Sequence, residues 1–301
     1  MYRTEVWMSK LESHNLKTPI CIPSYNRPNA PIFDKLSDFS KDDVFVFIRN
    51  NPEQKNLYKY LSDFFTLVYL PDYVEEVGTT RQAILEWAIK RDYENIFVLG
   101  DRITKVNVLS PKTSKSGKQS LVSSPNSNFR MAMIVWEFIL KNCPFTMSCP
   151  SHSGFSYFSK NIGVDYEINN GNISSCISIN VKDFQKHNIK YESVKTCGFE
   201  DATVLYRVLK AGLPVCKITD LEYDEVKSEK IFVGGNRDSS DKDRMDFCEK
   251  RNKLFWENIL NVPYGDIAEG VYLRKSGQGV YPYFKWDYWK EYFLEHSAKE
   301  L

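Results

Sequence analysis

The stretch T-P-I-C-I-P-S-Y-N-R-P, residues 18–28, decides the fold of this chain. Its apolar first part, Thr18–Ile22, is typical of a buried strand, and the polar part that opens at Pro23 is typical of a turn. Three more apolar runs follow within the first hundred residues: Val44–Ile48, Phe65–Leu70 and Ile96–Leu99. Because these runs are apolar throughout, we expect strands that are covered on both faces.

Helical patterns separate these strands: Pro31–Phe39, Gln54–Phe64 and Thr80–Ile89. Strands that alternate with helices indicate a mostly parallel central sheet flanked by helices. Since the crossovers of such a sheet are right-handed, the first hundred residues are expected to form a Rossmann-like half of an α/β fold.

The remaining chain is less regular. The segment Ser110–Asn128, rich in Lys, Ser and Thr, is expected to be a mobile polar loop or a lid. Further helices and strands are expected beyond it: Phe129–Lys141, Ile173–Val181, Ala202–Ala211 (closed by Gly212) and Val215–Tyr223. The simplest organisation is an α/β core over residues 1–225, with an aromatic-rich C-terminal extension over residues 226–301 that packs on it.

Composition excludes several classes of protein. The 301 residues are 42% hydrophobic and carry a formal net charge of +1, so bulk positive charge cannot be the basis of nucleic-acid binding. Apolar runs stay well short of the roughly 18 residues that span a bilayer, and residues 1–17 do not resemble a secretory signal. The seven cysteines are scattered without a C-x-x-C pair, which predicts reduced thiols and a cytoplasmic protein.

Basic residues gather where the strands are expected to end. Parallel strands share one carboxyl edge, where open α/β sheets bind ligands, and residues 23–28, 49–54 and 100–105 reach it. Three arginines lie at strand or helix ends on that side: Arg27, Arg49 and Arg81. Each alone is more often a solvated surface residue, but together they favour an anion, because guanidinium groups bind phosphate oxygens in pairs. Backbone N–H groups of Gly78, Thr79 and Thr80 are expected to be free at a helix start, which also favours an anion.

Acidic residues follow two of the expected elements. Asp101 ends the strand in I-F-V-L-G-D-R-I (residues 96–103), where it either holds a divalent cation or caps the turn and pairs with Arg102. Glu200 and Asp201 stand at a helix N-terminus, where the macrodipole favours acids; one of them is also placed to act as a general base. His152 lies in a small-residue loop, either as a plain loop histidine or within reach of a metal or phosphate.

Several chemistries lack their motifs. The sequence has no Walker A loop, no G-x-G-x-x-G and no G-x-S-x-G. A P-loop kinase, a dinucleotide dehydrogenase and a serine hydrolase are therefore not indicated. The four histidines show no zinc-like spacing.

In this order, the motifs resemble glycosyltransferases of the GT-A type over roughly residues 18–225. The matching segments are I-P-S-Y-N-R-P (22–28), V-G-T-T-R-Q-A-I (77–84), F-V-L-G-D-R-I (97–103) and G-F-E-D (198–201). Two further segments, S-C-I-S-I-N-V-K-D-F (175–184) and H-N-I-K-Y-E (187–192), make the chain most similar to the TET/JBP-associated glycosyltransferases. That group occurs largely in bacteriophages and is linked to modified DNA bases.

The resemblance implies a site for a nucleotide-sugar donor such as a UDP-sugar. The matching segments and the basic residues at the expected sheet edge together give the predicted donor-binding residues: Pro23, Ser24, Tyr25, Arg27, Arg49, Gly78, Thr79, Arg81, Asp101 and Arg102. The acceptor-side acids are Glu200 and Asp201, and the implied acceptor is a hydroxymethylated pyrimidine base in DNA.

The sequence departs from the family pattern where two or three acids are expected. Gly100, Asp101 and Arg102 stand there, so only the central acid is present. Two alternatives remain. Asp101 holds Mn²⁺ or Mg²⁺ with help from elsewhere, for instance from His152, or Arg102 itself neutralises the leaving diphosphate.

Two features bear on the acceptor. Three lysines, Lys112, Lys115 and Lys118, are placed to follow a phosphate backbone, and the aromatic residues of 280–293 are placed to stack on a flipped base. The spacing of Trp286, Trp289 and Phe293 fits a helix packed on the core better. Alternatives to a DNA-modifying enzyme are a GT-A transferase with a glycan, protein or small-molecule acceptor, and a catalytically inactive binding module.

Overall fold

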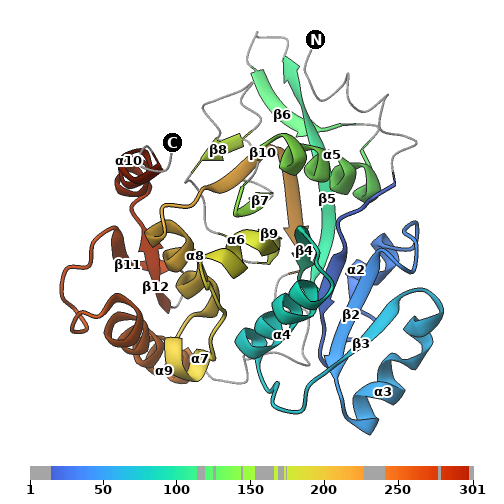
Figure 1. The fold of residues 1–301 in the computed structure, drawn as a ribbon, viewed down its shortest axis with the longest axis horizontal. Helices are drawn as coiled ribbons and strands as arrows, with labels where there is room; N and C mark the ends of the chain where they lie inside the picture. Colours follow the sequence, from blue (N-terminus) through green and yellow to red (C-terminus); the bar gives the residue numbers. More distant parts are fainter. Residues whose placement is uncertain are drawn as a thin grey trace.

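The computed structural model describes residues 15–113, 119–124, 127–143, 145–152, 166–168, 173, 175–226, 241–276 and 279–297. These residues form a ten-stranded mixed sheet in the order β3-β2-β1-β4-β9-β7-β10-β5-β6, with β8 paired to β10 (Figure 1). The strands are β1 (Ile20–Pro23), β2 (Val44–Arg49), β3 (Thr66–Leu70), β4 (Asn95–Leu99), β5 (Ile103–Thr113), β6 (Gln119–Ser123), β7 (Met147–His152), β8 (Tyr166–Ile168), β9 (Cys176–Asn180) and β10 (Val215–Glu225). The predicted α/β class is confirmed.

The first half of the sheet is parallel, as the sequence predicts. β1 pairs in parallel with β2 and with β4, and β2 pairs in parallel with β3. The crossover helices are α2 (Pro31–Lys35), α3 (Pro52–Tyr58) with the 3₁₀ helix η1 (Lys59–Asp63), and α4 (Val77–Lys90). Asn51 caps α3 by accepting a hydrogen bond from the Gln54 amide, and Pro52 occupies the first helical position.

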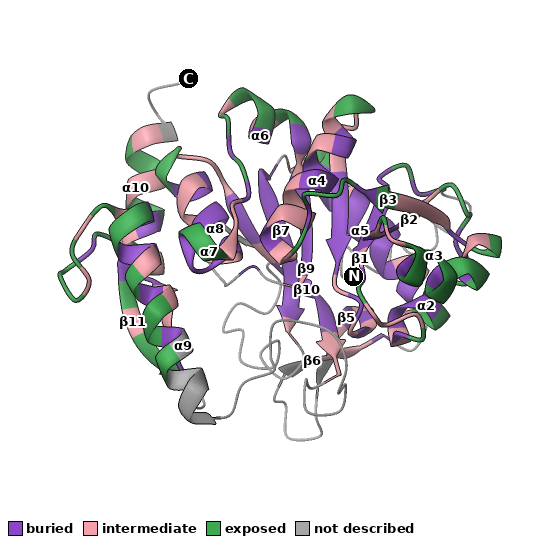
Figure 2. Ribbon diagram, turned by 90° about the horizontal axis from the view of Figure 1, so that it is seen from below, coloured by how far each residue is buried: buried purple, intermediate pink, exposed green. Residues whose placement is uncertain are grey.

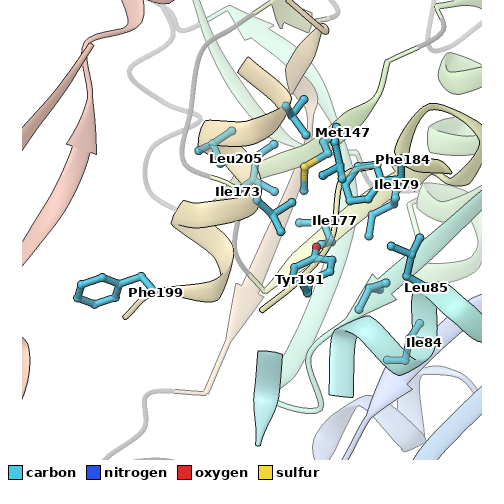
Figure 3. Close-up of a cluster of buried hydrophobic side chains, with 14 of the residues drawn as sticks. Ile84, Leu85, Met147, Ile173, Ile177, Ile179, Phe184, Tyr191, Phe199 and Leu205 are labelled. Carbon is cyan, nitrogen blue, oxygen red and sulfur yellow. The ribbon is translucent and has the colours of Figure 1, made fainter. Parts of the chain in front are cut away.

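Two apolar layers cover the sheet because successive strand residues face opposite sides. Ile20 and Ile22 of β1 belong to the layer that includes α2 and α5 (Phe129–Asn142), whereas Cys21 belongs to the opposite layer. The second layer is formed by α4, α6 (Val181–Lys186) and α8 (Glu200–Lys210). Figure 2 shows that the strands at the centre of the molecule are buried. Figure 3 shows side chains of α4, β9 and α8 meeting in the second layer.

The second half of the sheet is largely antiparallel. β9 pairs antiparallel with β4 and β7, and β5 pairs antiparallel with β10 and β6. The expected loop or lid at Ser110–Asn128 is therefore wrong for residues 110–113 and 119–123, which belong to the β5–β6 hairpin. An edge hairpin exposes much of its surface, so a polar composition does not exclude strands there. Lys115 and Lys118 lie outside the described residues.

The described part of the C-terminal extension packs on the second layer. It comprises α9 (Asp241–Leu254), a π-helical segment (Phe255–Leu260), β11 (Val271–Ser276), β12 (Gly279–Phe284) and α10 (Trp286–Ser297). Trp289 is 1% exposed, lies 5.9 Å between ring centroids from Tyr206 of α8, and donates its indole N–H to the Gly270 carbonyl. Packing explains this aromatic residue, as the helical spacing predicts. In the part of the chain that the structure describes, no helix is long and apolar enough to cross a membrane.

Candidate functional site

The topology singles out the carboxyl ends of β1 and β4. The chain leaves β1 through α2 toward β2 and β3 on one side, and returns through α4 to β4 on the other side. The layers assign α2 and α4 to opposite faces of the sheet. Adjacent strands with connections that diverge in this way form the switch point at which open α/β sheets bind ligands.

The loops after these two strands meet through an ion pair. Arg27 Nη1 lies 3.0 Å from Asp101 Oδ1, and the Ser24 hydroxyl donates to Asp101 Oδ2 at 3.0 Å. Tyr58 of α3 contacts the same loop: its hydroxyl lies 2.7 Å from Ser24 Oγ and accepts the Arg27 backbone N–H at 2.9 Å. The predicted residues Ser24, Arg27 and Asp101 are thus brought together.

Burial has the largest effect on the pKa values of Asp101 and Tyr58. It raises the pKa of Asp101 even though the Arg27 charge and the hydrogen bonds from Arg27 and Ser24 oppose the rise. Burial also raises the pKa of Tyr58 to about 12, so its hydroxyl keeps its proton at neutral pH. The cluster of Ser24, Arg27, Tyr58 and Asp101 therefore holds a formal ion pair and two neutral hydroxyl groups.

Arg49 lies at the carboxyl end of β2, beside the loop that follows β1. Its guanidinium carbon lies 3.9 Å from the centroid of the Tyr25 ring, and Nη2 donates to the Glu75 carbonyl. Neither of these partners carries a formal charge, so the two contacts do not balance the positive charge of Arg49 at this edge. Tyr25 is 36% exposed, which leaves part of the pair in contact with solvent.

The expectation of free N–H groups at the start of α4 is wrong. Glu76 caps this helix, and its carboxylate accepts the N–H groups of Gly78 and Thr79 at 3.1 and 3.2 Å, while its carbonyl accepts that of Thr80. The glutamate thus takes the place that an anion was expected to fill. A Cβ atom on Gly78 would lie 2.0 Å from the Glu192 carbonyl oxygen, so the glycine permits close packing instead.

Arg81 contributes to a second ion pair. Its Nη1 lies 3.4 Å from Glu200 Oε1, at the first residue of α8, and its guanidinium carbon lies 5.8 Å from the Tyr191 ring centroid. Burial, followed by the neighbouring Asp201 charge, raises the pKa of Glu200 to about 6 against the opposing effect of Arg81. Asp201 is half-buried, and Oδ1 accepts the Ala202 N–H at 2.9 Å.

The remaining predicted residues, Arg102 and His152, contact residues of β10, although the Arg102 charge also acts to lower the pKa of its neighbour Asp101. Arg102 forms an ion pair with Glu225 of β10 at 3.1 Å, and the His152 ring packs edge-on against Tyr223, 5.0 Å between centroids. Pro23 ends β1.

The residues around Asp101 do not fit a divalent cation. Such an ion takes about six oxygen ligands, whereas both Asp101 oxygens already accept hydrogen bonds and one faces a guanidinium. Within the described ranges, no group of three or more His, Cys, Asp or Glu side chains is arranged to hold a metal ion.

Sequence reasoning missed the residues that hold the site together. Tyr58 and Gln54 of α3 bind the loop after β1, Glu76 caps α4, and Tyr191 lies beside Arg81. The signal for Glu76 is weak: the macrodipole favours an acid at a helix start, but Ser, Thr, Asp and Asn are the usual N-cap residues. Tyr58 had no comparable signal, because its partner lies 34 residues away at Ser24.

Comparison with models of known protein families, and with curated proteins, gave no match. The chain is similar in structure to glucosyl-3-phosphoglycerate synthase from Mycobacterium tuberculosis in complex with Mg²⁺ and UDP, with 6% identity, 94% of this chain and 92% of that chain covered, and a TM-score of 0.45. It is also similar to GalNAc-T7 with UDP, GalNAc and Mn²⁺, with 9% identity, coverage of 96% and 58%, and a TM-score of 0.46.

A third similar structure is CMP:2-keto-3-deoxy-manno-octonic acid synthetase complexed with CTP, with 10% identity, coverage of 69% and 90%, and a TM-score of 0.41. Because these TM-scores lie below 0.5, the similarities carry no argument about function. The resemblance to TET/JBP-associated glycosyltransferases stays a prediction from the sequence.

Proposed function

We propose that this protein is a glycosyltransferase that moves a sugar from a nucleotide-sugar donor to a hydroxyl group. The observation that carries the proposal is the placement of Arg27, fixed by Asp101, at the switch point between β1 and β4. Fixed guanidinium groups suit a donor whose leaving group is a diphosphate, since negative charge develops on that group as the glycosidic bond breaks.

The donor side rests on two arginines with different surroundings. Asp101 balances the charge of Arg27 and fixes its position, whereas Arg49 retains its charge and stacks on Tyr25. In this proposal Arg27 orients the diphosphate, and Arg49 supplies the net attraction. The ribose or base then lies toward the exposed Tyr25 ring.

The acceptor side rests on the start of α8. Glu200 is 8% exposed and engaged with Arg81, whereas Asp201 is half-buried. We therefore assign Asp201 as the general base. It accepts the proton of the acceptor hydroxyl as the new bond forms between that oxygen and the anomeric carbon. The bond between the anomeric carbon and the diphosphate oxygen breaks, and the nucleoside diphosphate leaves with the electron pair.

Our specific hypothesis for the acceptor hydroxyl is a hydroxymethylated pyrimidine in DNA, and this hypothesis rests on the sequence resemblance. The packing of Trp289 removes one aromatic group from those expected to stack on a base. Lys112 lies in β5, and Lys115 and Lys118 lie outside the described residues. A glycan, protein or small molecule with a hydroxyl group is the alternative.

The test is incubation of the protein with a panel of nucleotide-sugars and either hydroxymethylated DNA, unmodified DNA or no acceptor. Mass spectrometry of the nucleosides and of the donor products is the readout. A sugar on the hydroxymethylated base supports the full proposal, and donor hydrolysis without DNA modification supports a transferase with another acceptor. A protein that neither binds nor turns over any donor contradicts the proposal and favours a binding module.

Metal dependence is tested in the same system. Since Asp101 is engaged with Arg27 and Ser24, the affinity for a nucleoside diphosphate is expected to be equal in EDTA and in Mn²⁺ or Mg²⁺. Isothermal titration calorimetry measures this affinity. An affinity at least tenfold higher with the metal would show that a cation does join the site and would return Asp101 to the role of a metal ligand.

A further inference from the structure

The loop after β1 is held by α3 at several points. Gln54 is 1% exposed and exchanges hydrogen bonds with Asn26, through its side-chain carbonyl to the Asn26 N–H and through its amide to the Asn26 side chain. Asn26 adopts a φ of 55°, a conformation that asparagine tolerates better than most residues. Tyr58, four residues after Gln54 on the same helix, is fully buried and contacts the loop on both sides of Asn26.

The available protons fix the direction of every hydrogen bond around Tyr58. The Arg27 backbone N–H can only donate, so the Tyr58 oxygen accepts from it. The Ser24 hydroxyl donates its single proton to the Asp101 carboxylate. Ser24 must then accept from Tyr58, whose proton is retained because its pKa is raised by burial.

These directions close a ring. The Arg27 backbone N–H donates to Tyr58, the Tyr58 hydroxyl donates to Ser24, and the Ser24 hydroxyl donates to Asp101 Oδ2. The Arg27 side chain donates to Asp101 Oδ1. With an ionised Asp101 every donor in the ring meets one acceptor, whereas a carboxyl protonated on Oδ2 would have to donate to Ser24 and reverse the Ser24 and Tyr58 hydrogen bonds. Tyr58 thus joins the backbone of Arg27 to the carboxylate that holds its guanidinium.

We propose that Tyr58 is a positioning residue for the donor diphosphate: through the ring with Ser24 and Asp101, its buried hydroxyl fixes the backbone and the guanidinium of Arg27 together. This inference rests on the proposed function, because it assigns Arg27 to the diphosphate. Tyr58 itself does not touch the donor. Its effect on binding passes through Arg27.

The experiment compares Tyr58→Phe with Tyr60→Phe. Tyr60 is 47% exposed, and its hydroxyl donates to the Pro28 carbonyl and to Asn29 of the same loop, at 2.6 and 2.9 Å. Both variants therefore lose hydroxyl contacts with the loop, but only Tyr58→Phe breaks the ring. Calorimetry with ADP, CDP, GDP, UDP and dTDP first identifies the tightest nucleoside diphosphate for the wild type, and the variants are measured with that compound.

Tyr58→Phe removes both hydrogen bonds of the Tyr58 hydroxyl and is expected to weaken binding about tenfold, because only part of their effect passes to the donor through Arg27. Tyr60→Phe is expected to change it less than about twofold. In the Arg27→Lys background, adding Tyr58→Phe should weaken binding by much less than tenfold, since the guanidinium that Tyr58 positions is already gone. A general loosening of the fold would instead multiply the two effects.

The outcomes separate the two proposals. If the wild type binds none of the five compounds, the proposed function fails and this inference fails with it. If the wild type binds but Tyr58→Phe behaves like Tyr60→Phe, or if the effects of Tyr58→Phe and Arg27→Lys multiply, only the positioning role is overturned. Should Tyr58→Phe not fold, Ser24→Ala cuts the ring at the next link, and unchanged binding in that variant overturns the inference equally.

Discussion

The two buried ion pairs, Arg27–Asp101 and Arg81–Glu200, have similar partners but different surroundings. Each joins segments far apart in the sequence, and each side chain is between 8% and 18% exposed. Asp101 accepts from both Arg27 and Ser24 at 3.0 Å. Glu200 faces Arg81 at 3.4 Å, and burial, followed by the adjacent Asp201 charge, raises its pKa.

The difference lies in how well each carboxylate is compensated. Asp101 belongs to a closed hydrogen-bond ring that its ionised form completes, and this arrangement suits a fixed position. Glu200, with a pKa of about 6, changes its protonation just below neutral pH. Burial raises the pKa of both carboxylates; Glu200 also lies beside the like charge of Asp201, whereas hydrogen bonds from Arg27 and Ser24 oppose the rise at Asp101.

The largest effect is expected from Asp201→Asn. This substitution removes the carboxylate next to Glu200 and leaves both members of the Arg81–Glu200 pair in place. If Asp201 is the general base, kcat falls by about 10² to 10⁴. Donor affinity, measured by calorimetry, should stay within about twofold because Arg27 and Arg49 are untouched. Full turnover in this variant would remove Asp201 from the reaction.

Arg81→Met tests the second pair directly. Removal of one partner of a buried pair destabilises a protein by about 3 to 5 kcal/mol. The loss is expected at pH 8 and should shrink at pH 5, where Glu200 takes up a proton. Urea denaturation at both pH values measures it.

The matched control is Lys195→Met, which removes an ion pair with Glu75 whose side chains are 73% and 71% exposed. That change should alter the free energy of unfolding by less than about 1 kcal/mol. An Arg81→Met loss as small as the control's would contradict the proposed contrast between buried and exposed pairs.

Glu200→Gln isolates the pH dependence. A carboxyl whose pKa rises from 4.5 to about 6 on folding binds its proton more tightly in the folded state, so stability falls as pH rises through that window. The wild type should lose about 2 kcal/mol relative to the glutamine variant between pH 4 and pH 7. Parallel stability curves for the two proteins would show that Glu200 titrates normally.

The smallest effect is expected from Arg102→Met, which bears on the alternative that Arg102 neutralises the diphosphate. Arg102 is held by Glu225, with side chains 21% and 23% exposed. Donor affinity is expected to change less than about threefold, in contrast to a loss of tenfold or more in Arg27→Met. Calorimetry with the same nucleoside diphosphate compares the two variants, and equal losses would make Arg102 a partner of the diphosphate.

The sequence predicts the parallel half of the sheet because its apolar runs alternate with helical patterns, although β3 at the edge of the sheet is only partly buried. It does not predict the β5–β6 hairpin, because an edge hairpin tolerates the polar residues of a loop. The meeting of Arg27 and Asp101 follows from the shared carboxyl edge. The pairing of Arg81 with Glu200 does not, because it depends on how α4, α8 and the chain around Glu192 pack, which no local pattern encodes.

The absence of a side chain at Gly78 has a consequence for the packing around the Arg81–Glu200 pair. A single methyl group there would meet the Glu192 oxygen at 2.0 Å and the Glu200 side chain at 3.3 Å. Even the smallest side chain would therefore push α4 away from the chain around Glu192 and change the spacing across which Arg81 reaches Glu200. Gly78 therefore sets how closely α4 approaches the chain around Glu192 and the start of α8.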